Sequence, residues 1–178
     1  MAILKILLLA LSLITPEETT WVRVNAPEGI SFLFPNAPQK ITKNVDGIPT
    51  VIYQTKDLAC VAGVVCSDLS AKHLRMDGKM ALQIYENMKA ATLEMETVVL
   101  RDEMTVPYDN MLIKEIQYSI TKDNHEMTYY KRFIFRDNHI YQINIGAQNR
   151  YSDLLEKERE IFFNSVTFTD KEKTNNQK

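Results

Sequence analysis

The sequence predicts an α+β domain, in which one antiparallel β-sheet carries a helix on each face. Short stretches in which apolar and polar residues alternate, separated by Gly, Pro, Asn or Asp, indicate β-strands. Two longer stretches repeat their apolar residues at the period of an α-helix. Some strands are apolar on both sides, so both faces of the sheet need a covering layer. Helices on opposite faces are the simplest such layers.

Length and composition fit one ordinary folded domain. The chain has 178 residues, 45% of them hydrophobic and 25% charged, which excludes disordered, collagen-like and coiled-coil proteins. The net charge of −2 argues against a nucleic-acid-binding protein, which needs a strongly basic face. Only 5 residues are glycine, well below the usual share of about 7%, and this disfavours the glycine-rich loops that hold nucleotide phosphates.

The first twenty residues have the pattern of a secretory signal peptide. Lys5 precedes an apolar run from Ile6 to Ile14 that only Ser12 interrupts. The run is too short for a membrane span, which needs about 20 residues. We therefore expect residues 1–15 to be a signal peptide, 16–170 to form a single domain and 171–178 to be a polar tail. The protein would then be exported, to the periplasm or the outside. The alternative is an N-terminal helix or strand that docks on the domain.

Strands are expected throughout the first third of the domain. Asp46-Gly47 between two alternating stretches is a strong β-hairpin signal. The last stretch is continuously apolar, so it is expected to be a central strand with both faces covered. The expected strands are Trp21–Asn25, Ile30–Phe34, Gln39–Val45, Ile48–Thr55 and Leu58–Cys66.

Two helices are expected, one in the middle of the chain and one near its end. Asp77–Met95 begins with Asp77 as a plausible N-cap, and its apolar stripe is Ala81, Ile84, Met88, Ala91 and Met95. Asn149–Asn164 is the second helix, with Glu156–Glu160 as its solvated face. Its apolar stripe is Tyr151, Leu154, Leu155, Ile161 and Phe162.

Four strands between the helices form a meander, and a short strand closes the domain. The stretch Tyr129–Phe135 is apolar on both faces near its end, which again favours cover on both sides. The sheet would have seven to nine strands in total. The later strands are Thr97–Val106, Met111–Thr121, His125–Arg136, His139–Ala147 and Ser165–Phe168.

Both ends of the domain carry short motifs of a known family. The start, Gly29-Ile-Ser-Phe-Leu-Phe-Pro35 followed by Asn36-Ala-Pro38, resembles the opening of Mog1/PsbP-like domains. The ending Phe162-Phe-Asn-Ser-Val-Thr-Phe168 is similar to the close of those domains. The resemblance spans Trp21 to Phe168. It implies an α+β fold and a binding or accessory role. Members share no catalytic motif, so no functional residue is carried over to this chain.

The two cysteines are expected to be buried apolar residues. Cys60 and Cys66 are six residues apart in one expected strand, about 20 Å at 3.3 Å per residue. A disulfide needs Cα atoms within about 7 Å, so they cannot pair there. A thiol-dependent redox protein is one hypothesis for the function, and it requires that Cys60 or Cys66 be exposed.

Candidate catalytic and metal sites are weak. The three histidines show no metal-binding spacing, and His73 with Asp77 offers only two ligands, so no cofactor and no metal is expected. Acidic residues of the meander allow a carboxylate-dependent hydrolase as the alternative function, with Glu103 across from Glu115. The acidic residues concerned are Asp102, Glu103, Glu115 and Glu126.

One stretch interleaves aromatic and basic residues and is the candidate interaction patch. Its residues are Tyr129, Lys131, Arg132 and Arg136. The alternative is core aromatics whose neighbouring cations reach out to solvent. The sequence as a whole favours a non-enzymatic exported module that binds an unidentified ligand, with a protein partner in the cell envelope, no nucleic acid and no membrane span.

Overall fold

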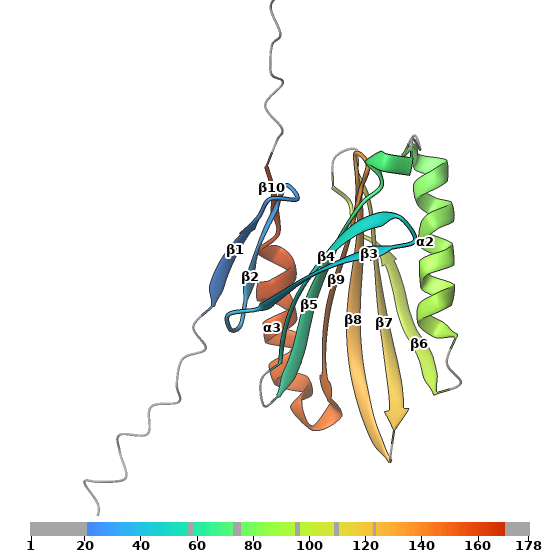
Figure 1. Cartoon of the computed structure of the whole chain (residues 1–178). Coiled ribbons are helices and arrows are strands. Elements are labelled where there is room, and N and C mark those ends of the chain that lie inside the picture. The colour runs from blue at the N-terminus through green and yellow to red at the C-terminus, as the bar shows by residue number, and fades with distance from the viewer. Residues whose placement is uncertain are drawn as a thin grey trace, which may run out of the picture.

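The computed structural model describes residues 21–56, 59–72, 76–94, 97–108, 111–122 and 124–169. These residues form an α+β fold with a main and a smaller antiparallel sheet (Figure 1). The main sheet has the order β3-β4-β5-β9-β8-β7-β6, and the smaller one β1-β2-β10. The strands are β1 (Val22–Ala26), β2 (Ile30–Phe34), β3 (Gln39–Val45), β4 (Ile48–Lys56), β5 (Cys60–Asp68), β6 (Val98–Thr105), β7 (Leu112–Lys122), β8 (His125–Arg136), β9 (His139–Gln148) and β10 (Thr167–Phe168). The helices are α2 (Gly78–Leu93), α3 (Ser152–Asn164) and the short 3-10 turns η1 (Ser70–Lys72) and η2 (Asn149–Tyr151).

The expected single sheet is divided in two. After β2 the chain passes Pro35 and Pro38 and enters β3, which pairs only with β4. Proline lacks the N–H that a continuing ladder needs, so the strand ends there. The β3–β4 hairpin turns at Asp46 and Gly47, whose φ angles are 52° and 78°, as its sequence predicts.

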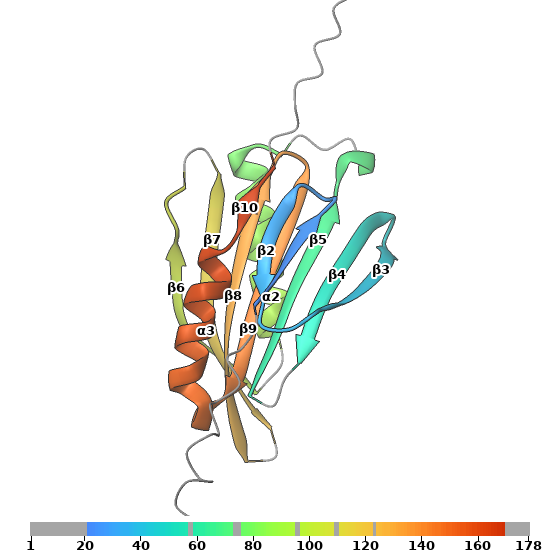
Figure 2. The ribbon, with the colours of Figure 1, turned by 90° about the vertical axis from the view of Figure 1, so that its left-hand side faces the viewer.

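The alternation of side chains along the strands divides the core into two clusters. In β9, Tyr141, Ile143 and Ile145 join the cluster that contains β2 and α3, whereas Ile140 joins the cluster that contains Tyr85 of α2. In Figure 2, α3 lies in front of the main sheet and α2 behind it. The helices therefore pack on different sets of side chains from the same strands.

Helix α2 begins where the sequence predicts. The Asp77 side chain accepts a hydrogen bond of 2.9 Å from the Met80 amide, which caps the helix. Ala81 and Tyr85 are its buried residues. Of the expected stripe, Ala91 is exposed and Met95 lies outside the described residues.

Helix α3 buries Leu155 and Phe162 as predicted, but the rest of its buried face differs from the predicted stripe. Leu154 and Ile161, expected in the buried stripe, are 40% and 43% exposed. Glu158, expected on the solvated face, is buried. The buried residues are Leu155, Glu158, Phe162 and Phe163. Leu154-Leu155 and Ile161-Phe162 are adjacent apolar pairs, so the sequence does not decide which member of each pair is buried. The ring of Phe162 packs on Phe34 of β2, with ring centroids 5.1 Å apart, and this contact sets the orientation of the helix.

Among the residues that the structure describes, part of the main sheet has no covering layer on the side of α2. Helix α2 packs on β6 and β7. Val61 and Val65 of β5 point to the same side and are only half-buried. The prediction that both faces of this strand are covered is therefore wrong on this side.

The two outer strands of the main sheet pair on one side only. Strand β3 pairs with β4, and β6 pairs with β7. The register of β6 shifts between Leu100 and Asp102, which makes a bulge. The predicted signal peptide and most of the polar tail lie outside the described residues. In the described part of the chain, none of the helices has the length and apolar character that a membrane crossing requires.

Candidate functional site

A groove of about 610 Å³ lies on the open part of the sheet, over β4 and β5 and up to β9. Its volume is in the range of ligand sites in proteins. Most of its lining is aliphatic or carries side-chain amides, and Lys56 is the one ionisable residue among those that line it. The aliphatic residues are Ile52, Val61 and Val65, and the amides are Gln39, Gln54 and Asn144.

The strand register places the polar residues in a row that crosses the sheet. Gln54 of β4 lies opposite Gly63 of β5, and Gly63 lies opposite Asn144 of β9. Asn144 in turn lies opposite Lys131 of β8. Residues opposite each other in a sheet point to the same face, so Gln54, Gly63 and Asn144 follow one another along the floor of the groove, and Lys131 comes next beyond it.

The side-chain amide of Asn144 lies over Gly63 and forms the floor of the row there. A Cβ atom at Gly63 would lie 3.1 Å from Oδ1 of Asn144, closer than ordinary contact. Val61 and Val65, two residues away on either side, point to the same face and stand above it. The result is a trough between two valines that runs across the strands.

Lys131 lies next to Asn144, beside α2. Its Nζ donates a hydrogen bond of 3.1 Å to Oγ1 of Thr92 in α2, and lies 5.1 Å from the ring centroid of Phe133. Burial lowers the pKa of Lys131 to about 8. Within the described ranges, no carboxylate forms an ion pair with this ammonium group. The cation therefore has one hydroxyl and one ring as partners.

The structure does not bring the four residues of the predicted patch together. Tyr129 and Lys131 point to the side of α2, where Tyr129 stacks on Tyr118. Arg132 and Arg136 point to the other side. Arg132 donates to the carbonyl of Phe163 in α3, and Arg136 lies over a ring of β10. An interaction role stays a prediction for these residues, and of the four only Lys131 adjoins the row of the groove.

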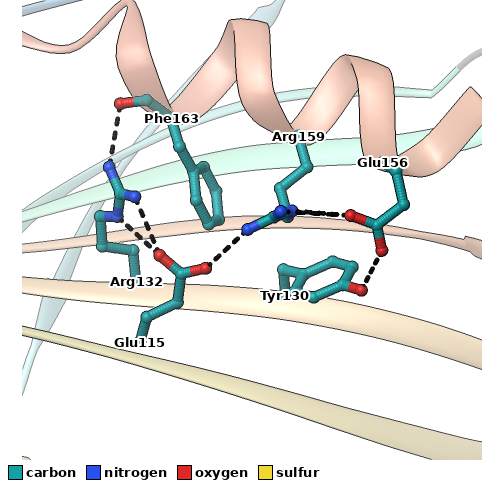
Figure 3. A network of polar contacts seen from close by, with 6 residues as sticks. All are labelled: Glu115, Tyr130, Arg132, Glu156, Arg159 and Phe163. Carbon is teal, nitrogen blue, oxygen red and sulfur yellow. Dashed lines mark hydrogen bonds and ion pairs between the residues drawn. The ribbon is translucent and has the colours of Figure 1, made fainter. Parts of the chain in front are cut away.

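Arg132 instead belongs to a buried ionic network between α3 and the main sheet (Figure 3). Glu115 of β7 is 4% exposed and accepts hydrogen bonds from Arg132, at 2.9 and 3.0 Å, and from Arg159, at 3.1 Å. Arg159 also pairs with Glu156, which accepts a hydrogen bond from the hydroxyl group of Tyr130. The charges shown are paired with one another, so the network joins α3 to β7 and β8.

Three of the four carboxylates expected for a hydrolase, Glu103, Glu115 and Glu126, are paired with basic side chains, while Asp102 lines a small pocket beside Glu115. Glu103 lies opposite Ile116, on the side of α2, and not across from Glu115 as predicted. Burial acts to raise the pKa of Glu103, but hydrogen bonds from Tyr85 and Lys89 outweigh it and lower the pKa. A hydrogen bond from Arg101 lowers the pKa of Glu126. A catalytic acid needs the opposite shift.

The histidines do not combine either. His125 and His139 lie at opposite ends of the β8–β9 hairpin, and His73 lies outside the described residues. Among the residues that the structure places, no three His, Cys, Asp or Glu side chains could share a metal ion.

Both cysteines are buried, as predicted, with 3% and 1% of Cys60 and Cys66 exposed. Burial raises the pKa of Cys66 to about 12. The thiol-dependent hypothesis requires an exposed thiolate, and the structure provides none at these two positions.

The groove itself was not predicted from the sequence. One signal was present, because a glycine inside a strand often marks a close approach of another chain or ligand. Gly63 stands in the middle of the apolar stretch of β5. The continuous apolar pattern around it indicated a covered strand instead.

Comparison with known proteins identifies the fold. No protein-family model matches the chain, and no curated protein sequence matches it. Among solved structures, the chain is similar to cyanobacterial PsbP (CyanoP) from Synechocystis, with a TM-score of 0.56 and 13% identity over 86% of this chain and 95% of that one. It is also similar to LpqN of Mycobacterium tuberculosis, described as involved in cell envelope biogenesis, with a TM-score of 0.48 and 11% identity over 84% and 91%. A protein of unknown function from Pseudomonas aeruginosa matches with a TM-score of 0.43 and 12% identity, over 79% of this chain and 94% of that one. The fold is the PsbP-like fold that the sequence resemblance predicts.

Proposed function

We propose that this PsbP-like domain is a non-enzymatic binding module that holds its ligand in the groove over β4, β5 and β9. The groove is large enough for a ligand and carries aliphatic and amide side chains. Amides and aliphatic groups bind and orient a molecule but transfer no proton at neutral pH. Of the acidic residues that a hydrolase would use, Glu103, Glu115 and Glu126 are paired with arginine, lysine or tyrosine.

The groove follows from a three-layer arrangement, which is part of the proposal. We take the domain to be a sandwich with α3 on one face of the main sheet and α2 on the other. The division of the core into two clusters supports this arrangement. A single helix of 16 residues is too narrow to cover a seven-stranded sheet, so one half of the face of α2 stays open.

Titration with Nile red, a neutral apolar dye, tests the groove. We expect a saturable rise in fluorescence with the unmodified protein. Val65→Glu should abolish the rise, because it places a charge on the wall of the groove. Leu154→Glu is the control and should leave the rise unchanged. Leu154 is an aliphatic residue of α3 that is 40% exposed and lies outside the groove. Unchanged dye binding by Val65→Glu would contradict the assignment.

We further propose that the protein is exported and binds a protein partner in the cell envelope. The support is the sequence pattern, a cation at Lys5 followed by the apolar run Ile6–Ile14. Intact mass spectrometry of the protein recovered from its own cells tests the export step. A mass that lacks residues 1–15 is expected, and a full-length mass in the cytoplasmic fraction would count against export.

A further inference from the structure

The trough at Gly63 has the length of a short extended peptide. The row from Gln54 through Gly63 and Asn144 to Lys131 crosses three strand-to-strand steps. At about 4.8 Å per step this is about 14 Å. An extended chain advances about 3.3 Å per residue, so about four residues fill the row.

The chemistry along the trough suits a peptide backbone. Gln54 and Asn144 each carry an N–H donor and a carbonyl acceptor, which match the two polar groups of a peptide unit. Gly63 between them has no side chain, and the side-chain amide of Asn144 lies over it, so this amide forms the floor that a guest backbone contacts. Val61 and Val65 flank the row and offer apolar contacts to side chains of the guest.

The trough ends at Lys131. The next position of the row is Ile116 of β7, which is fully buried in the cluster below α2. A bound chain cannot continue past this point along the row. Lys131 therefore meets the last group of the chain, and its ammonium has no carboxylate partner within the described residues. A half-buried cation without a counter-charge favours an anion there.

We propose that the trough binds the C-terminal end of an extended peptide of about four residues, with the terminal carboxylate paired to Lys131. The proposal rests on the groove as the binding site and adds the class of ligand and its direction. The peptide lies across the strands, so that its C-terminus is at β8 and its N-terminal residues are at β4.

Two peptide pools test the proposal by two-dimensional NMR of the ¹⁵N-labelled protein. Both pools contain N-acetylated tetrapeptides with Ala, Ser, Val or Leu at each position, and one pool ends in a free carboxylate, the other in an amide. We expect the carboxylate pool to shift the amide signals of Gly63 and Asn144. Its apparent affinity should be about tenfold higher than that of the amide pool, as for loss of one charge-assisted hydrogen bond.

Two lysine variants test whether Lys131 causes the difference in affinity between the two peptide pools. Lys131→Met should remove the difference between the pools. Lys114→Met is the matched control and should preserve it. Lys114 is also half-buried, donates a 2.8 Å hydrogen bond to a threonine hydroxyl and lies 5.5 Å from the centroid of the Tyr85 ring. Its neighbours in the sheet are Thr105 and Phe133, so it does not lie in the row that contains Asn144.

The outcomes separate this proposal from the function on which it rests. Equal affinity of the two pools, or an unchanged preference in Lys131→Met, overturns the carboxylate assignment. Binding of neither pool overturns the peptide assignment, while saturable Nile red binding that Val65→Glu abolishes still supports the groove. Failure of Nile red to bind refutes the groove itself.

Discussion

Removal of the Lys131 charge should stabilise the protein, although the residue is proposed to bind a ligand. Lys131→Met keeps an unbranched side chain of similar length and removes the ammonium group. The folded protein has to bury that cation next to Phe133 with one hydroxyl partner, Thr92, whereas the unfolded chain hydrates it fully.

The magnitude follows from proton affinity. Burial lowers the pKa of Lys131 from 10.5 to about 8, and one pKa unit corresponds to about 1.4 kcal/mol. Below pH 8 both states carry the proton, so the buried charge costs the folded state about 3 kcal/mol. Loss of the hydrogen bond to Thr92 offsets about 1 kcal/mol of this. We expect Lys131→Met to raise the free energy of unfolding by about 2 kcal/mol at pH 7.

The pH dependence gives a second, independent readout. Between pH 8 and 10.5 the unfolded state binds more protons at this lysine than the folded state, so the lysine protein gains stability as pH rises. The advantage of Lys131→Met should therefore shrink steadily above pH 8. Urea unfolding of both proteins at pH 7, 8, 9 and 9.5 measures it as a difference, in which the titration of tyrosines and thiols cancels. A variant that is no more stable at pH 7, or a difference that stays constant with pH, refutes the reasoning.

Three further perturbations probe packing and burial. Glu115→Gln should lower the free energy of unfolding by about 3 kcal/mol, because it leaves two arginines without their buried counter-charge. Glu126→Gln removes one partner of an exposed pair and should leave the urea midpoint nearly unchanged. Similar midpoints for the two variants would contradict the buried network. Gly146→Ala should cost about 2 kcal/mol or more in thermal unfolding, since its Cβ would lie 2.2 Å from the ring of Tyr129, whereas Gly78→Ala, which meets open space, should be neutral or stabilising. A thiol reagent should label neither cysteine in the native protein and both in urea, and fast native labelling would refute their burial.

Strands were predictable from the sequence because their signals are local. Alternating apolar residues and tight turns identify β7, β8 and β9 within a few residues, and the turn at Asp137 has the left-handed φ of 52° that Asp tolerates. The N-cap of α2 is equally local, since Asp77 bonds an amide three residues later.

The orientation of α3 is not determined by its local sequence. Leu154 and Leu155 are adjacent, as are Ile161 and Phe162, so the apolar stripe can be drawn with either member of each pair. Contact with Phe34 of β2, 128 positions earlier in the chain, selects Phe162. Burial of Glu158 follows from this orientation of the helix, and the sequence pattern of the helix does not predict it.

The candidate site depended on an uncovered surface, which periodicity cannot reveal. A continuous apolar strand indicates apolar surroundings, and the same residues that would pack below a helix can also line an open groove. The residues of the patch from Tyr129 to Arg136 are divided between the two faces of the sheet for a simpler reason. Tyr129 and Lys131 differ from Arg132 and Arg136 in the parity of their positions, and in a strand this parity sends them to opposite faces.

The outer strands of the main sheet also bear on how the protein behaves at high concentration. An unpaired strand offers its backbone groups to the sheets of other molecules, and this is a route to aggregation. Strand β3 carries Lys40 and Lys43 along its exposed length, and the bulge of β6 around Arg101 interrupts its ladder. Charge on one rim and an irregular backbone on the other disfavour edge-to-edge pairing between neighbouring molecules, so we expect the sheet to end at its own outer strands.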